Sequence, residues 1–189
     1  LDLLTQAPRT VEELAEQAQL SIANTSQHLQ RLKAAGHVSS ERSGTYIRYR
    51  LADAAVTRLW LDLRAVATQQ LAEVEPALNA YRPQRREFET INAAELQKRL
   101  QRNEVVLIDV RPREEYAAGH LPGAISIPLT ELEARLDRLP HDRTIVTYCR
   151  GPYCVYADQA LEILREHGMH GVRLEDGVNE WRLAGGVVD

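Results

Sequence analysis

Two cysteines, Cys149 and Cys154, are the only thiols in the chain of 189 residues. Cys149 directly follows the apolar run 144–148, which is typical of a buried strand, and it precedes a segment typical of a helix. Because ligands of open α/β sheets bind beyond the carboxyl ends of strands, this position indicates a reactive site. A disulfide scaffold would spread its cysteines more widely, so the pair indicates either reactive chemistry or two small core residues.

The loop that begins at Cys149 has the composition of an anion-binding turn. Its further residues are Arg150, Gly151, Pro152, Tyr153 and Cys154. If the loop curls, its backbone N–H groups point inward beside the start of the next helix, and such a nest stabilises an anion. Gly151 permits backbone angles that other residues resist. We therefore expect the pKa of the Cys149 thiol to lie below its usual value, with Arg150 adding to the effect. The loop suits a thiolate, a persulfide anion or an oxyanion attached to sulfur.

Short strands alternate with helices around this loop. A second apolar run, 104–110, contains Asp109 near its end and predicts another buried strand. Helices are expected over 113–118, 130–139, 154–167 and 178–183, with one more strand at 172–174. This alternation predicts an α/β sandwich around a central parallel sheet.

Several motifs flank the cysteine loop in a fixed order. They are Asp109-Val-Arg111, Glu115-Tyr116, residues 119–124, Ile127-Pro128, residues 174–177, Trp181 and Ala184-Gly185. Together they resemble the rhodanese homology region. The resemblance implies that the loop cysteine accepts a sulfane sulfur, holds it as a persulfide and passes it to cyanide or a thiol. By position that cysteine is Cys149, and the implied activity is that of a thiosulfate or polysulfide sulfurtransferase.

The chain departs from the rhodanese pattern at two positions. Cys154 stands where many rhodaneses carry a basic or hydroxyl residue, and Asp176 replaces a usual glycine. Both departures argue against ordinary thiosulfate turnover. One hypothesis is that Cys154 resolves a persulfide on Cys149 into a disulfide or polysulfide. The alternative is that Cys154 only packs the start of the following helix.

Asp109 and Arg111 are predicted to support the site and not to react. We expect Asp109 to fix the loop and Arg111 to pair with an acid such as Glu115. A phosphatase loop is excluded because Val155 stands where the required arginine would be. The histidines show no metal-ligand spacing, so neither a metal nor a cofactor is expected.

The first third of the chain predicts two helices followed by a hairpin. Thr10 and Glu13 form a capping box before the first helix. Ser21 caps a second helix over 22–35, which Gly36 ends. Strands over 38–42 and 45–51 surround a turn at 43–44. This order is that of a mainly α winged helix-turn-helix with a β-hairpin wing.

The second helix would place polar side chains in the major groove of DNA, and the wing would contact the backbone. The predicted DNA-binding residues are Ser21, Ala23, Asn24, Gln27, His28 and Arg31 on the helix and Arg42 and Arg48 on the wing. Residues 20–38, with Ser26, His28 and Leu29 at their centre, resemble the recognition segment of ArsR-family repressors. The resemblance covers about residues 1–80.

A long helix is predicted over 54–80, with an apolar stripe along one side. In the ArsR family the corresponding helix forms the dimer interface, and a homodimer fits a palindromic operator. The alternative is that the stripe packs against its own domain.

The chain therefore reads as two domains, 1–82 and 88–189, joined by a linker at 83–87 around Pro83. Residues 1–86 hold 11 Lys and Arg against 9 Asp and Glu, whereas residues 87–189 hold 12 against 18. A modest basic excess beside an acidic domain suits a DNA-binding unit with a partner domain. No apolar run approaches the roughly 20 residues of a membrane helix, and no signal peptide is visible, so we expect a cytoplasmic location.

The leading hypothesis joins the two halves. A homodimeric operator-binding regulator would sense or transfer sulfane sulfur through Cys149, and modification there would alter its DNA affinity. A second hypothesis is a sulfurtransferase whose winged-helix part mainly dimerises. A third is a repressor with an inactive rhodanese fold that serves as an interaction module.

Overall fold

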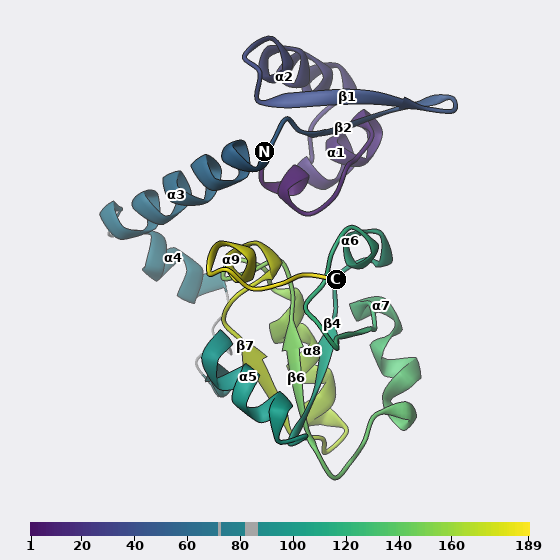
Figure 1. Cartoon of the computed structure of the whole chain (residues 1–189), viewed down its shortest axis with the longest axis vertical. Helices are drawn as coiled ribbons and strands as arrows, with labels where there is room; N and C mark the ends of the chain where they lie inside the picture. The colour runs from purple at the N-terminus through teal and green to yellow at the C-terminus, as the bar shows by residue number, and fades with distance from the viewer. Residues whose placement is uncertain (72, 82–86) are drawn as a thin grey trace. The chain divides into compact units, whose positions relative to one another are not determined.

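The computed structural model describes residues 1–71, 73–81 and 87–189. It divides the chain into two compact units, residues 1–72 and 73–189 (Figure 1). The first unit ends earlier than the boundary predicted at residue 82. The predicted linker at 83–87 lies outside the described residues except for Glu87.

The first unit consists of helices and one hairpin. Its elements are η1 (Asp2–Thr5), α1 (Val11–Ala18), α2 (Ile22–Ala34), β1 (Val38–Ser43), β2 (Tyr46–Leu51) and α3 (Ala54–Gln70). The Thr10 hydroxyl accepts from the Glu13 N–H, and the Glu13 carboxylate accepts from the Thr10 N–H, which confirms the capping box. Gly36, with a φ of +74°, lies just after α2 as predicted. Leu14, Leu29, Val38 and Tyr49 meet in the core and hold the two helices against the hairpin.

The prediction of one continuous helix over 54–80 is wrong. Helix α3 ends at Gln70, Leu71 has an extended backbone (φ −96°, ψ 99°), and α4 (Val74–Tyr81) begins anew. Pro76 supplies the physical reason, because a proline inside a helix lacks the N–H that bonds four residues back and its ring clashes there. In the first turn of α4 that N–H is not needed, so the break lets Pro76 be accommodated.

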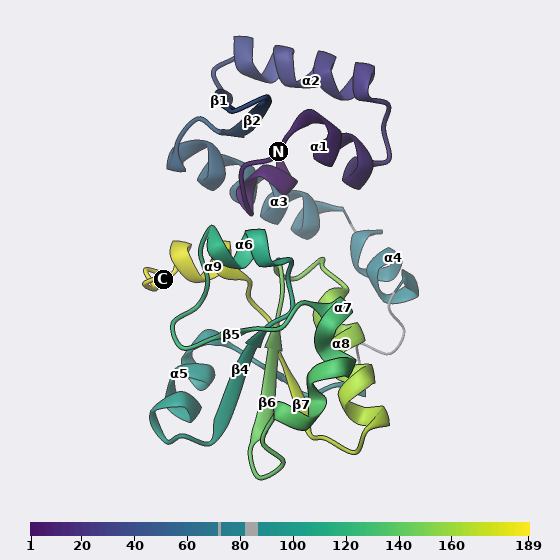
Figure 2. The ribbon, with the colours of Figure 1, turned by 90° about the vertical axis from the view of Figure 1, so that its right-hand side faces the viewer.

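The second unit is an α/β sandwich, which confirms the predicted fold class. Its elements after α4 are β3 (Thr90–Ile91), α5 (Ala93–Gln101), β4 (Val105–Asp109), α6 (Arg113–Ala117), β5 (Ile125–Ser126), α7 (Leu129–Leu132), η3 (Glu133–Arg138), β6 (Thr144–Tyr148), α8 (Tyr156–Glu166), β7 (Gly171–Leu174) and α9 (Val178–Leu183). The five strands pair in parallel in the order β3-β7-β6-β4-β5, so β6 lies in the middle of the sheet (Figure 2).

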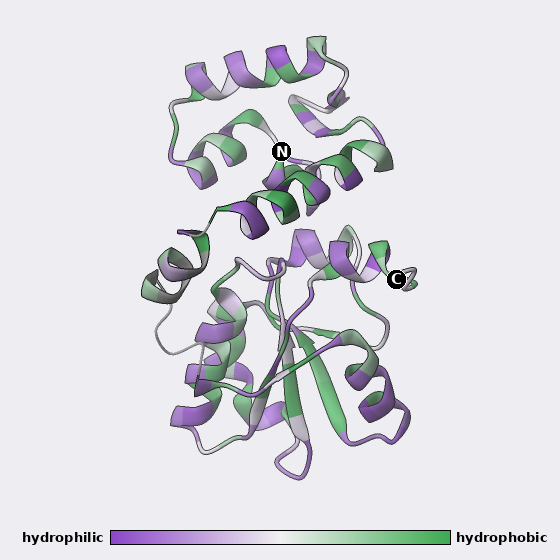
Figure 3. Cartoon of the chain, turned by 90° about the vertical axis from the view of Figure 1, so that its left-hand side faces the viewer, coloured by the Kyte–Doolittle hydropathy of each residue, from purple (hydrophilic) through white to green (hydrophobic). Residues whose placement is uncertain are grey.

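Both faces of this sheet are buried. Ile108 and Ile145 face Leu161 of α8 on one side, whereas Leu107 and Val146 face the side of Trp181. Successive residues of a strand point to opposite faces, so a strand that is covered on both sides must be apolar throughout. The strands are accordingly among the most hydrophobic segments of the unit (Figure 3).

Three elements of the second unit were not predicted, namely β3, α5 and β5. Asn92 caps α5 by accepting from the Glu95 N–H at 2.9 Å, a local signal that was present in the sequence. The helix predicted over 130–139 is a short α7 continued by the 3-10 helix η3. Among the described helices, none combines the length and apolar character that crossing a bilayer requires.

Candidate functional site

Cys149 lies where β6 ends, as predicted. Its side chain is 2% exposed and packs in the core on the α8 side of the sheet. The backbone N–H of Ala157, in the first turn of α8, hydrogen-bonds to the Cys149 sulfur. Strand β6 and the start of α8 thus fix this sulfur from two sides.

Cys149 and Cys154 are both thiols in the structure, and their side chains hydrogen-bond to each other. Cys154 is only half-buried. The backbone N–H groups of Arg150 and Tyr156 hydrogen-bond to its sulfur, and its own N–H donates to the Gly151 carbonyl at 3.2 Å. The loop therefore does curl, and its donors converge on the Cys154 sulfur.

The expected lowering of the Cys149 pKa is wrong for the dithiol. Burial and the contact with Cys154 raise the pKa of Cys149 well above its usual value. The hydrogen bond from Cys149, with help from the two backbone N–H groups, lowers the pKa of Cys154 to about 6. One negative charge is therefore shared by the pair, and it resides mainly on the more exposed sulfur, Cys154.

Arg150 does not supply a lone positive charge to Cys149. Its guanidinium donates to both oxygens of Glu115, with an Nη2 to Oε1 distance of 2.6 Å. Glu115 is fully buried. Arg150 also lies over the ring of Tyr156, 5.2 Å from its centroid. The charge of Arg150 is thus balanced by the Glu115 carboxylate. For this reason Arg150 does not lower the pKa of Cys149 as the sequence predicted.

Arg111 forms an ion pair with an acid, as predicted, and that acid is Asp109. The charge of Glu115 also acts on Arg111 and raises its pKa. The Arg111 Nη2 lies 2.6 Å from the Asp109 Oδ2, and both side chains are almost fully buried. The same Nη2 donates to the Gly119 carbonyl at 2.8 Å. Because Asp109 and Arg111 are two residues apart at the end of a strand, their side chains point to the same side of the sheet. The pair fixes the turn at residue 119, which fits its predicted supporting role.

Two glycines let other segments approach the cysteine loop closely. Gly151 has a φ of +118°, which confirms that it adopts unusual backbone angles. A Cβ on Gly177 would come within 2.6 Å of the Arg150 carbonyl carbon and the Gly151 nitrogen. The turn between β7 and α9 therefore presses directly on the loop.

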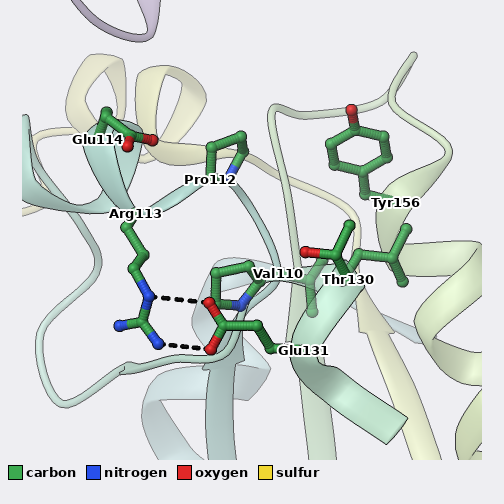
Figure 4. Close-up of a pocket in the computed structure, with 9 residues that line it drawn as sticks. Val110, Pro112, Arg113, Glu114, Thr130, Glu131 and Tyr156 are labelled. Carbon is green, nitrogen blue, oxygen red and sulfur yellow. Dashed lines mark hydrogen bonds and ion pairs between the residues drawn. The ribbon is translucent and has the colours of Figure 1, made fainter. Parts of the chain in front are cut away.

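A hollow of about 330 Å³ lies beside the loop at the carboxyl end of β4 (Figure 4). Its lining includes Val110, Thr130 and Tyr156, and an ion pair between Arg113 and Glu131 crosses it. Neither cysteine lines it. Its lining residue Tyr156 lies just beyond the loop, and the Arg150 guanidinium packs over the Tyr156 ring.

The predicted DNA-binding residues of α2 are all exposed, namely Ser21, Ala23, Asn24, Gln27, His28 and Arg31. Ser21 has a second role, because its hydroxyl accepts from the Asn24 N–H and caps the helix. Thr25 and Leu29 of α2 are buried, and His28 and Arg31 border the same hollow as these two residues. The helix thus offers a polar face for a major groove.

The two predicted wing arginines differ in placement. Arg42 is exposed on β1, and its Nε donates to the Gly44 carbonyl. Arg48 on β2 is half-buried, and its guanidinium donates to the Pro8 carbonyl at 3.2 Å. Arg42 is therefore better placed for a phosphate than Arg48. Among the residues that the structure describes, no group of three or more His, Cys, Asp and Glu side chains is arranged to hold a metal ion.

Comparison with known families places both units. Residues 1–40 match the model of the arsR family of bacterial regulatory proteins, and residues 92–184 match the rhodanese-like domain. The whole chain is 47% identical to the HTH-type transcriptional regulator Rv0324 of Mycobacterium tuberculosis and covers 83% of that protein. The chain belongs to the ArsR family of transcriptional regulators. The regulator carries a rhodanese-like domain as its second unit, and membership of this family implies DNA binding.

Two further relatives match the rhodanese-like unit of the regulator. A sulfurtransferase of Allochromatium vinosum is 34% identical over 97 residues, half of this chain and 89% of that one. The crystal structure of the BH2092 protein from Bacillus halodurans is similar, with a TM-score of 0.51 and 32% identity. That match covers 59% of this chain and 84% of the other.

Sequence reasoning missed one charged pair beneath the loop of the regulator. Arg173 on β7 is 1% exposed, its Nε lies 3.0 Å from the Asp158 Oδ1, and its Nη2 donates to the Gly151 carbonyl. Its charge acts to lower the pKa of Cys149, against the larger effect of burial. The sequence did contain a signal for this pair, because an arginine within a short apolar strand is buried and a buried charge needs a partner of opposite charge.

We expect iodoacetamide to alkylate Cys154 of the regulator at a rate that rises with pH through a midpoint of about 6. The thiolate is the reactive form, so the rate falls as pH drops below that value. Timed alkylation with peptide mass mapping across a pH series measures each cysteine separately. In Cys149→Ala, Cys154 loses its thiol donor and the midpoint shifts upward. A wild-type midpoint near the ordinary value of about 8.5 would contradict the shared charge.

Proposed function

We propose that this regulator binds a palindromic operator as a homodimer and accepts sulfane sulfur on Cys149, and that the modified loop changes its affinity for DNA. The observation that carries the proposal is the buried Cys149 at the end of β6, hydrogen-bonded to a second thiol in an ArsR-family chain. DNA as the partner implies a cytoplasmic location.

The exposed face of α2 supports the DNA-binding part. Asn24, Gln27 and Arg31 carry donors and acceptors that fit the base edges of a major groove. Arg42 on the wing suits a phosphate. We propose that α2 reads sequence and the wing fixes the register.

An exposed apolar stripe on α3 supports dimerisation. Leu59, Leu63 and Val66 recur at helical spacing and are each more than half exposed. Such a stripe on a soluble unit marks an interaction surface. We propose that the dimer interface lies along α3 and not over the whole range 54–80, because the helix ends at Gln70.

The sulfur chemistry follows from the thiol pair. The Cys149 sulfur attacks the outer sulfur of a donor R–S–SH. An S–S bond forms at Cys149, the donor's S–S bond breaks, and the Cys149 proton passes to the released R–S⁻ to give R–SH. The Cys154 thiolate then attacks the Cys149 sulfur, forms a disulfide and expels HS⁻. In sum, R–S–SH and two thiols give R–SH, H₂S and one disulfide, and the donor is the oxidant. If a free thiol or cyanide takes the outer sulfur first, the loop returns to the dithiol.

DNA-binding titrations with and without sodium polysulfide test the proposal. Fluorescence anisotropy on a palindromic promoter fragment should show salt-dependent binding, because phosphate contacts release counterions. We expect polysulfide to change the affinity by at least about fivefold, the lower end of usual coupling between sites. The effect should disappear in Cys149→Ser. An affinity that polysulfide leaves unchanged overturns the sensing part.

The second candidate function is an enzyme whose winged-helix unit mainly dimerises. The similarity to a protein named sulfurtransferase favours it. Sulfur release to cyanide, dependent on Cys149 but without any operator binding, would support this candidate. Operator binding without any sulfur release would instead support a repressor whose rhodanese-like unit is inactive.

A further inference from the structure

The cysteine loop has few groups left for an anionic sulfur donor. Thiosulfate is a dianion, and its binding needs backbone donors or an unbalanced positive charge near Cys149. The positions available to it are the N–H groups of residues 150–154 and the two arginines, Arg150 and Arg173, that touch the loop.

Two of the backbone donors of the loop are occupied by contacts within the loop. Pro152 has no N–H, so residues 150–154 offer four such groups. The N–H of Arg150 points to the Cys154 sulfur, as does that of Tyr156 just beyond the loop. The N–H of Cys154 donates to the Gly151 carbonyl. The Cys154 sulfur thus sits where the loop would hold an external anion.

Both arginines beside the loop are balanced by carboxylates. Arg150 is bound by both oxygens of Glu115, and Arg173 is ion-paired with Asp158. A third carboxylate lies against the loop backbone, because a Cβ on Gly151 would fall 2.8 Å from the Glu180 Oε2. The acidic groups at the loop therefore outnumber the basic ones, even before a cysteine thiolate is counted.

We propose that the loop takes sulfane sulfur from hydropersulfides, R–S–SH, and disfavours thiosulfate, because the Cys154 sulfur fills the anion position of the loop. This inference rests on the proposed function of Cys149. A hydropersulfide carries at most one charge, so it meets less repulsion than the dianion. Its transfer is balanced as above: an S–S bond forms at Cys149, the S–S bond of the donor breaks, the Cys149 proton passes to the released R–S⁻, and Cys154 keeps its negative charge.

The test compares two donors on the full-length protein. Glutathione persulfide and sodium thiosulfate are each mixed with the dithiol protein, the reaction is quenched by alkylation, and mass spectrometry counts Cys149 persulfide plus Cys149–Cys154 disulfide. Both donors react with the same cysteine, so the intrinsic reactivity of Cys149 cancels out when the two second-order rate constants are expressed as a ratio. In the wild type we expect the rate constant for thiosulfate to be at least about a hundredfold lower than that for glutathione persulfide, because the two negative charges of thiosulfate are repelled by the Cys154 thiolate.

Replacing Cys154 provides a gain-of-function test. Cys154→Ser keeps a group that accepts the same N–H bonds but removes the charge, so we expect the ratio to move toward thiosulfate by about tenfold or more. Cys154→Ala serves as a second uncharged variant, and Cys154→Asp is the matched charged control that should keep the wild-type ratio. Similar wild-type constants for both donors, or an unchanged ratio in Cys154→Ser and Cys154→Ala, overturn the inference. If Cys149 accepts sulfur from neither donor, it is instead the proposed function that fails.

Discussion

Cys149→Ser is expected to lower the rate of sulfur acceptance by at least about a thousandfold, the usual cost of deleting a nucleophile. A serine hydroxyl does not ionise near neutral pH and forms no persulfide, so the first step of the chemistry is lost. Intact-protein mass spectrometry after exposure to glutathione persulfide measures the gain of one sulfur. Because serine is close to cysteine in size, the buried position next to Ala157 stays filled.

The matched control for this experiment is Cys154→Ser. That variant keeps the nucleophile and lacks the resolving thiol, so it should accumulate the Cys149 persulfide without forming a disulfide. Sulfur that still adds to the Cys149→Ser protein at the wild-type rate would show that Cys149 is not the acceptor. A Cys154→Ser protein whose persulfide decays as fast as in the wild type would show that Cys154 has no resolving role.

Glu115→Ala is expected to destabilise the rhodanese-like unit by about 3–5 kcal/mol, because it leaves the Arg150 guanidinium without its carboxylate. The Glu115 side chain is 0% exposed and that of Arg150 is 18% exposed. Denaturant unfolding followed by tryptophan fluorescence measures the loss. The two units each contain one tryptophan, Trp60 and Trp181, so a Trp60→Phe background reports the second unit alone.

Two further variants separate a lost partner from a general loss of packing. Glu115→Leu combined with Arg150→Leu removes both charges and should recover most of the stability, since a buried pair adds little net energy over apolar residues. Glu131→Ala breaks the solvent-exposed pair with Arg113 and should cost far less than Glu115→Ala. Equal losses in Glu115→Ala and in the double variant would contradict the argument.

The elements that the sequence predicted well are those with local signals. The capping box at Thr10 and Glu13, the cap at Ser21 and the turn glycine Gly36 marked the helices of the first unit. Helix α9 was predicted over its full length. Pro76 also carried a local signal, but the apolar stripe across it was given more weight, and one helix was predicted where the structure has two. Strands β3 and β5 have two residues each, too few to show a period.

The site was predicted less completely than the fold. The position of Cys149 was predicted correctly, because the apolar run that forms β6 is clear in the sequence and Cys149 directly follows it. The partners of the charged groups do not follow, because Arg150 meets Glu115 and Arg173 meets Asp158 only once the sheet is assembled. The direction in which the pKa of Cys149 shifts depends on burial and on neighbouring groups, so the local sequence could not predict it.

Gly177 has a mechanical consequence for the regulator. Since no side chain separates this residue from the backbone at Arg150 and Gly151, nothing compressible absorbs a displacement of the loop. If Cys149 gains a sulfur atom or forms a disulfide, as proposed, we expect the turn that begins α9 to be displaced. The Trp181 indole on that helix donates to the Val187 carbonyl, and Asp189 exchanges backbone hydrogen bonds with His120. The proposed bond formation at the buried Cys149 sulfur would thus reach His120 and Asp189 through direct contacts.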